Sequence, residues 1–154
     1  MSVLEAETVV DAAPEAVWNV ISDPHNLPMW DRRVAGVRDV PPAGLRKGSA
    51  YKVELKFMGV KASVLANVLE YDPPSCSKVR LTGIMDATIE TWVEPEGADR
   101  SRLRHRIDYG FRGGPLGSFA AQAVRMLGAN ALLRRGIEAQ KRQAEAAAKR
   151  PTTA

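Results

Sequence analysis

The chain has 154 residues, of which 45% are hydrophobic and 26% charged, and it carries a formal net charge of +4. This length fits one domain with a substantial core, and this composition excludes the disordered and fibrous classes. No window reaches the ~20 apolar residues that span a bilayer, and the start of the chain lacks the regions of a signal peptide. One cysteine, Cys76, excludes an internal disulfide, so we expect a cytoplasmic protein without a transmembrane segment.

The first strand is predicted over residues 3–10, VLEAETVV. Two short helices are predicted within residues 13–30, APEAVWNVISDPHNLPMW. Pro14 suits the first turn of a helix, where its missing N–H costs nothing. Asp23 precedes Pro24 and ends the first helix, because a residue before proline avoids the α region. The chain therefore begins with one strand and two short helices.

A period of two follows and predicts about six antiparallel strands with one apolar face. In the strand YKVELKF, the apolar side chains that share a face are Tyr51, Val53, Leu55 and Phe57. In the strand RLRHRIDYGF, the corresponding face carries Leu103, His105, Ile107, Tyr109 and Phe111. The strand over 86–94 allows two orientations, of which the one with Ile89, Thr91 and Val93 facing inward is favoured over the one with Glu90 and Trp92.

A long helix is predicted over 114–148, where apolar residues recur three and four positions apart. It is the only element long enough to cover the apolar face of the sheet. Small residues along it, such as Ala123 and Gly128, fill the space against a curved sheet poorly. Poor filling is costly in a purely structural core, so we expect an apolar cavity between this helix and the sheet.

The basic residues do not predict a nucleic-acid site. Arg102, Arg104 and Arg106 alternate with apolar residues along one strand, which is typical of a solvated outer face. No exposed aromatic residues are interleaved with them to stack bases. We therefore expect no nucleic-acid partner.

Four segments resemble the START-like superfamily, also called the helix-grip or polyketide cyclase/dehydrase and lipid-transport family. They are APEAVWNVISDPHNLPMW between the first two strands, VLEYDPP before a turn, TWVEPEGADRSRL across a late hairpin and GGPLGSFAAQAV at the start of the last helix. The resemblance implies an α+β helix-grip fold, with a curved antiparallel sheet around a long C-terminal helix. It implies a single ligand-binding domain over 1–150 and a disordered tail over 151–154.

The expected ligand site follows from the inward faces of the strands and from the apolar stripe of the helix. Its predicted lining is Tyr51, Val53, Leu55, Phe57, His105, Ile107, Tyr109, Phe119, Ala123, Met126 and Asn130. His105 and Tyr109 are the candidates for proton transfer, and an equally weighted alternative for His105 is a core histidine satisfied by a backbone or hydroxyl partner. No spacing typical of a metal site occurs, and no cofactor is expected.

Two functions from different classes remain open. The first is the binding of a hydrophobic small molecule, polyketide- or lipid-like, for carriage, sequestration or self-protection, by a monomer or weak dimer. The alternative is a polyketide aromatase/cyclase that promotes aldol cyclisation or dehydration, for which the sequence offers candidates but no catalytic motif. A regulatory or chaperone-binding module is a third class, and no exposed hydrophobic stripe supports it.

Overall fold

The computed structural model describes residues 2–57, 59–111, 114–115, 118, 121–122 and 128–149. Its elements are, in chain order, β1 (Ser2–Val10), α1 (Pro14–Ile21), a 3₁₀ turn η1 (Pro24–Asn26), α2 (Leu27–Trp30), β2 (Val34–Arg38), β3 (Ala50–Phe57), β4 (Val60–Asp72), β5 (Cys76–Gly83), β6 (Met85–Pro95), β7 (Ser101–Phe111) and α4 (Ala129–Lys149). The predicted order of one strand, two short helices, six strands and a long helix is confirmed. The tail over 151–154 lies outside the described residues.

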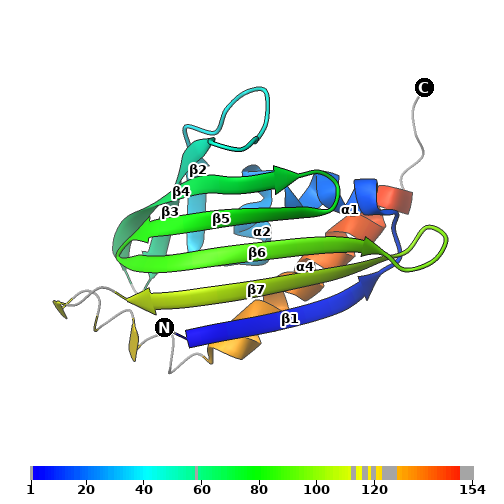
Figure 1. Ribbon diagram of the computed structural model, residues 1–154. Coiled ribbons are helices and arrows are strands. Elements are labelled where there is room, and N and C mark those ends of the chain that lie inside the picture. The colour runs from blue at the N-terminus through cyan, green and yellow to red at the C-terminus, as the bar shows by residue number, and fades with distance from the viewer. Residues whose placement is uncertain are drawn as a thin grey trace.

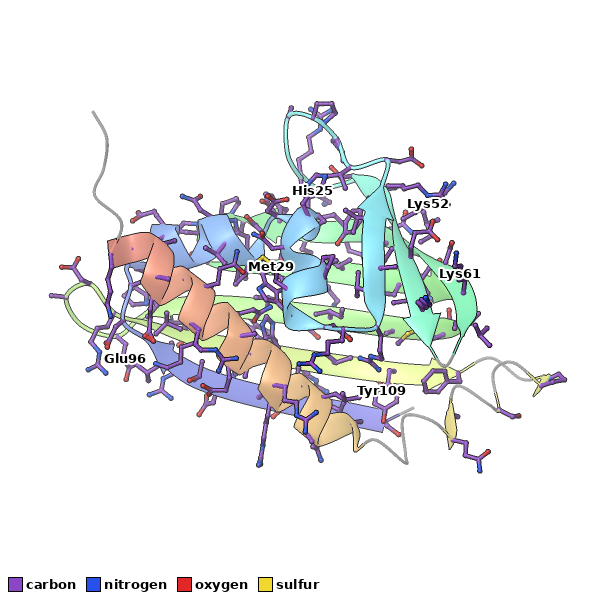
Figure 2. The ribbon with its side chains drawn as sticks, turned by 180° about the vertical axis from the view of Figure 1, so that it is seen from behind. His25, Met29, Lys52, Lys61, Glu96 and Tyr109 are labelled. Carbon is purple, nitrogen blue, oxygen red and sulfur yellow. The ribbon has the colours of Figure 1, made fainter. Side chains whose placement is uncertain are left out.

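The described strands form one antiparallel seven-stranded sheet in the order β1-β7-β6-β5-β4-β3-β2. From β2 to β7 each strand pairs with the next one along the chain, whereas β1 joins the far edge by pairing with β7, Ser2 opposite Tyr109. The sheet curls, and α1, α2 and α4 lie on the same face of it (Figure 1; Figure 2). These three helices therefore lie against the concave face.

Helix α1 forms for the local reasons that the sequence indicates. Pro14 occupies its first turn, where Glu15 also complements the helix dipole. Val17, Trp18 and Val20 are its buried residues. The helix therefore buries one face and anchors the N-terminal segment on the sheet.

The structure decides between the two orientations that the sequence allowed for the strand over 86–94, which is β6. Ala87, Thr91 and Val93 are buried, which confirms that the branched set faces inward. Trp92 lies on the outer face, where the guanidinium of Arg104 sits 4.3 Å from its ring centroid. This distance suits a cation–π contact.

The arginines of β7 lie on the outer face of the sheet and have acidic partners. Arg102 pairs with Glu96 at 2.8 Å and with Glu7 at 3.3 Å. Arg106 lies 3.9 Å from Glu5. Exposed pairs of this kind stabilise a fold by at most about 1 kcal/mol each, so these residues act mainly as a solvated surface.

The predicted helix over 114–148 is wrong at Gly128. Gly128 lies outside the helical conformation, with φ +73, and α4 begins at the next residue. The carbonyl of Gly128 accepts the N–H of Leu132 at 3.1 Å, so this glycine opens α4 rather than continuing a helix through itself. Its left-handed φ is one that glycine adopts without steric cost. Among the helices that the structure describes, none is long and apolar enough to cross a membrane.

The buried side chains form two separate clusters. One joins β1, α1, β6, β7 and α4, and its members are Val10, Ala12, Val17, Trp18, Val20, Val93, Leu103, Ile137 and Ala144. The other lies on β2, β3 and β4, and its members are Val34, Tyr51, Val53, Val64, Ala66 and Val68. Helix α4 packs mainly on β1 and α1, so it belongs to the first cluster and leaves the concave face between the two clusters less filled.

Candidate functional site

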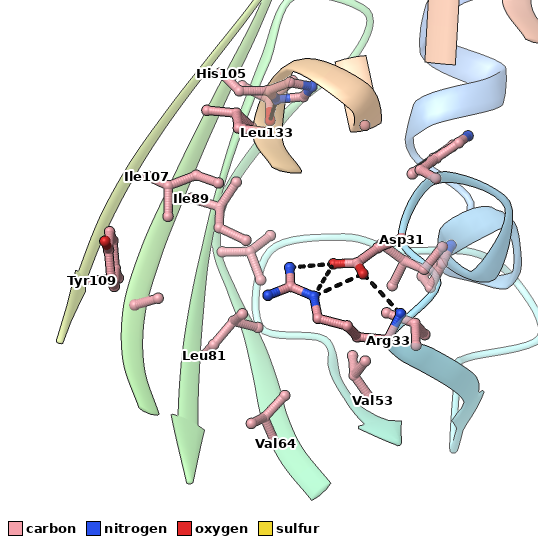
Figure 3. Close-up of a pocket in the computed structure, with 18 of the residues that line it drawn as sticks. Asp31, Arg33, Val53, Val64, Leu81, Ile89, His105, Ile107, Tyr109 and Leu133 are labelled. Atoms are coloured by element: carbon pink, nitrogen blue, oxygen red, sulfur yellow. Dashed lines mark hydrogen bonds and ion pairs between the residues drawn. The ribbon is translucent and has the colours of Figure 1, made fainter. Parts of the chain in front are cut away.

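A cavity of about 390 Å³ occupies the space between the helices and the concave face of the sheet. Its walls come from the first strand, both short helices, the inward faces of β2 to β7 and the first half of α4. Most of the side chains that line it are aliphatic or aromatic, among them Val53, Val64, Leu81, Ile89 and Leu133 (Figure 3). A mostly apolar cavity of about 300–1,000 Å³ with a few polar groups is typical of small-molecule sites.

Six of the predicted site residues line this cavity: Tyr51, Val53, Leu55, His105, Ile107 and Tyr109. They come from β3 and β7, whose inward faces the alternation of the sequence identified. The side chain of Phe57 and the residues Phe119, Ala123 and Met126 lie outside the described part of the chain. The structure thus brings the strand half of the predicted lining together.

Asn130 is exposed and does not line the cavity, so its predicted place on the buried stripe of the helix is wrong. Asn130 lies in the first turn of α4, which begins at Ala129. The residues of that helix that line the cavity are Ala129, Leu132, Leu133, Gly136, Ile137 and Gln140. At about 100° per residue, Asn130 falls about 90° from the centre of this face.

His105 is buried, and both of its ring nitrogens already have partners inside the protein. Nδ1 lies 2.9 Å from the hydroxyl of Thr91, and Nε2 lies 2.6 Å from Oε1 of Gln140 on α4. Nε2–H donates to Gln140, and Nδ1 then accepts from Thr91. Burial lowers the pKa of His105, against a smaller opposing effect of the hydrogen bond to Gln140. The imidazole is therefore neutral and locked between sheet and helix.

Two tyrosines add hydroxyl groups to the cavity walls. Tyr51 is 7% exposed, and burial raises its pKa to about 12. Its hydroxyl has no hydrogen-bond partner among the described residues. Tyr109 packs edge-on against Phe111, with ring centroids 5.9 Å apart. The phenol of Tyr51 is therefore neutral near pH 7, and the hydroxyl groups of both tyrosines can donate a hydrogen bond to a ligand.

The two cavity tryptophans are tied to their neighbours. Nε1 of Trp18 lies 3.4 Å from the hydroxyl of Tyr71, and the two rings are tilted with centroids 5.6 Å apart. Nε1 of Trp30 donates to Oε1 of Gln143 on α4 at 2.8 Å. These bonds fix α1 and α2 around the cavity, so both tryptophans have a structural role.

Asp31 and Arg33 form a charged pair in the cavity wall that the sequence reasoning missed (Figure 3). Both residues lie in the short connection between α2, which ends at Trp30, and β2, which begins at Val34. Burial alone would raise the pKa of Asp31, but the side-chain hydrogen bonds, charge and backbone N–H of Arg33 outweigh it and lower that pKa. The letters DRR after a helix carry no strong signal, because a short charged run in a connection usually lies in solvent.

The described residues offer little for metal or nucleophilic chemistry. Within them, no group of three or more His, Cys, Asp or Glu is placed to hold a metal ion. Cys76 begins β5, and burial together with the charges of Asp72 and Glu70 raises the pKa of its thiol. A raised pKa leaves a thiol protonated and weakly nucleophilic.

Comparison with known proteins identifies the class to which this fold and cavity belong. The family model described as polyketide cyclase / dehydrase and lipid transport matches residues 1–145, so the chain belongs to that family. Membership implies that the protein binds a hydrophobic ligand. No curated protein matches the chain.

Solved structures share the fold at low sequence identity. The Zhui aromatase/cyclase from Streptomyces sp. R1128 has a TM-score of 0.75 and 16% identity, over 94% of this chain and 93% of its own. A protein from Thermus thermophilus has a TM-score of 0.74 and 18% identity, over 96% and 100%. A START superfamily protein from Mycobacterium smegmatis has a TM-score of 0.65 and 14% identity, over 96% and 97%. These likenesses confirm the helix-grip fold.

Proposed function

We propose that the protein binds a polyketide- or lipid-like hydrophobic molecule in the cavity between the sheet and α4, and carries or sequesters it. The observation that supports this most is the cavity of about 390 Å³ with mainly apolar walls. An empty apolar space of this size forfeits packing contacts that a solid core would have. A bound apolar molecule restores those contacts.

The geometry around His105 favours binding over catalysis. A general acid or base has to lie within hydrogen-bond reach of the group that it protonates or deprotonates. Both nitrogens of His105 are instead engaged by Thr91 and Gln140. To transfer a proton to a ligand the imidazole would have to leave two buried partners, so we do not assign it a catalytic role.

The test is a titration with N-phenyl-1-naphthylamine, a neutral apolar fluorophore. Ala87 lines the cavity near the start of β6 and is 2% exposed. We expect the wild type to bind the probe saturably at one site, and Ala87→Phe to bind it at least about 10-fold more weakly because the new ring takes up cavity space. Fluorescence titration gives both affinities, and native mass spectrometry gives the stoichiometry.

Ala146→Phe is the matched control, because Ala146 is exposed on α4 and outside the cavity lining. It should bind the probe as the wild type does. Circular dichroism shows whether each variant keeps the fold. The proposal is overturned by a wild type that binds no probe, or by a folded Ala87→Phe variant with unchanged affinity.

A further inference from the structure

The charged pair in the cavity wall has a geometry that points to the chemical class of the ligand, and this inference rests on the proposed function. Every charged side chain among the described lining residues belongs to this pair, Asp31 and Arg33. Each of the two side chains is about one-third exposed, 31% and 32% respectively. The pair is thus only partly withdrawn from water.

Asp31 holds the guanidinium of Arg33 in one orientation. Nε donates to Oδ1 at 2.9 Å and to Oδ2 at 3.2 Å, and Nη2 donates to Oδ2 at 2.6 Å. The backbone N–H of Arg33 also donates to Oδ1, at 2.9 Å. Two parallel bonds to a carboxylate fix the plane of a guanidinium as well as its position. Arg33 is therefore preorganised before any ligand arrives.

Part of the donor capacity of Arg33 is left over. A guanidinium carries five N–H groups, and the bonds to Asp31 use one edge of it. Nη1 has no hydrogen-bond partner among the described residues. A donor that is fixed in a largely apolar cavity, with free N–H groups, is suited to an acceptor atom on a bound molecule.

The charge of the pair decides which acceptor fits. Asp31 neutralises Arg33, so the pair brings no net charge to the cavity. A ligand carboxylate would have to lose its hydration near the carboxylate of Asp31, which is costly for an anion that gains no net counter-charge. A neutral carbonyl oxygen accepts the same N–H groups without that cost. Neutral ketone carbonyl groups occur in both polyketide-like and lipid-like molecules.

We propose that Arg33, held by Asp31, donates a hydrogen bond to a neutral carbonyl oxygen of the ligand, so that the cavity selects apolar ketones over hydrocarbons and over carboxylates. Arg33 is then the polar anchor of the site, and Asp31 is a positioning residue. The apolar walls supply most of the affinity, and the anchor sets the orientation of the ligand.

The experiment measures affinities by isothermal titration for three matched probes: 9-fluorenone, fluorene and fluorene-1-carboxylate. A hydrogen bond to a charged group changes affinity by about 10- to 100-fold, so we expect fluorenone to bind that much more tightly than each of the other two. A fourth probe, the alkyl ketone 2-undecanone, distinguishes a lipid-like ligand from an aromatic one. If the protein binds 2-undecanone more tightly than fluorenone, the ligand is lipid-like.

The double variant Asp31→Asn, Arg33→Met removes the donor without leaving an unpaired charge. We expect it to lose the preference for fluorenone while its affinity for fluorene stays within about twofold. Arg32→Met is the matched control, because Arg32 is exposed and does not line the cavity, and it should keep the preference. Should the double variant fail to fold, the infrared carbonyl stretch of fluorenone bound to the wild type replaces it, and a shift to lower frequency than in hexane is expected.

Equal binding of fluorenone and fluorene by the wild type overturns the anchor and leaves the proposed function standing. A preference that survives in the folded double variant, or an unshifted carbonyl stretch, overturns it as well. If neither fluorenone nor fluorene binds the wild type, the proposed function itself fails. Failure of the anchor is therefore distinguishable from failure of the cavity.

Discussion

His105 shows how a single residue joins the sheet to the helix that covers it. Its ring lies between Thr91 on β6 and Gln140 on α4, and all three are buried. A buried polar group that loses its partner costs about 1–3 kcal/mol. The imidazole therefore contributes to stability by forming hydrogen bonds with two buried groups at once. Its role in the cavity wall is structural.

His105→Phe should lower the free energy of unfolding, and the loss should depend on pH. Burial lowers the pKa of His105 below its ordinary value of 6.5. Between that value and the lower folded-state pKa, the unfolded chain takes up a proton that the folded protein does not, so wild-type stability falls as the pH drops, by up to about 1.4 kcal/mol per pH unit. The variant lacks this contribution, so the deficit of about 1–3 kcal/mol expected near pH 7.5 should shrink towards pH 5.

Urea denaturation of both proteins at pH 7.5 and pH 5.0 measures this difference. A deficit that stays constant over this range would mean that His105 does not remain neutral in the folded protein. Wild-type stability at either pH alone does not decide the matter, because other groups titrate as well.

At the residue scale, the sequence predicted the face on which a strand residue lies better than it predicted which side chains that residue contacts. Alternation along β7 is enough to place His105 and Ile107 on the inward face, because side chains of a strand change face at every step. The bond from His105 to Gln140 spans 35 positions and depends on how α4 is placed on the sheet. The pair of Asp31 and Arg33 was missed for a related reason: only the packing of α2 over the cavity turns a charged connection into part of the wall.

At the scale of the element, the turn between β5 and β6 depends on Gly83. Its φ is +148, and a Cβ built there would lie 2.9 Å from the backbone carbonyl oxygen of Ser63 on β4. That distance is too short for a carbon atom, and the obstructing atom is backbone that cannot rotate away. Gly83 thus allows β4 and β5 to stay close where the chain turns towards Met85, which lines the cavity.

Gly83→Ala should lower the free energy of unfolding by about 1–3 kcal/mol, the cost of one residue held in a sparsely populated backbone conformation. Gly36→Ala on β2 is the control, because a Cβ at Gly36 meets nothing within 4 Å and its φ is not in the left-handed region. Chemical denaturation monitored by fluorescence gives both values. Equal stability of the two variants would contradict the role assigned to Gly83.

The sequence predicted strands more accurately than the final helix for a physical reason. A strand reveals its inward face within a few residues, as Tyr51 and Val53 do, because the period of two needs no reference point. In a helix the period alone does not show where the helix starts or how wide its buried face is. A stripe counted from Leu116 runs through Gly128, although α4 begins after that glycine. Its members Leu133 and Ile137 do line the cavity, whereas Asn130, in the first turn of α4, does not.

At the scale of the whole molecule, occupancy of the cavity should appear as stability. A ligand that binds only the folded state at 100 times its dissociation constant stabilises the fold by about 2.7 kcal/mol. For a chain of about 150 residues this raises the melting temperature by about 5–11 °C. We expect this shift with N-phenyl-1-naphthylamine in differential scanning calorimetry for the wild type and for Ala146→Phe. Ala87→Phe, which binds at least about 10-fold more weakly, should show at most about half of this shift at the same probe concentration, and an equal shift in all three would place the probe outside the cavity.

The pairing of β1 with β7 also sets an order of events during synthesis. Glu7 and Arg102, which pair across these strands, are 95 positions apart, so β1 is made well before its partner strand. At about 5–20 residues per second the ribosome needs roughly 5–20 s to supply that partner. During this interval β1 is an unpaired strand, and such strands are prone to associate with other chains. Glu5 and Glu7, which later pair with the arginines of β7, give the unpaired β1 a negative charge that repels other copies of the same strand. We therefore expect these two carboxylates to oppose association of the nascent chain before they become part of the folded surface.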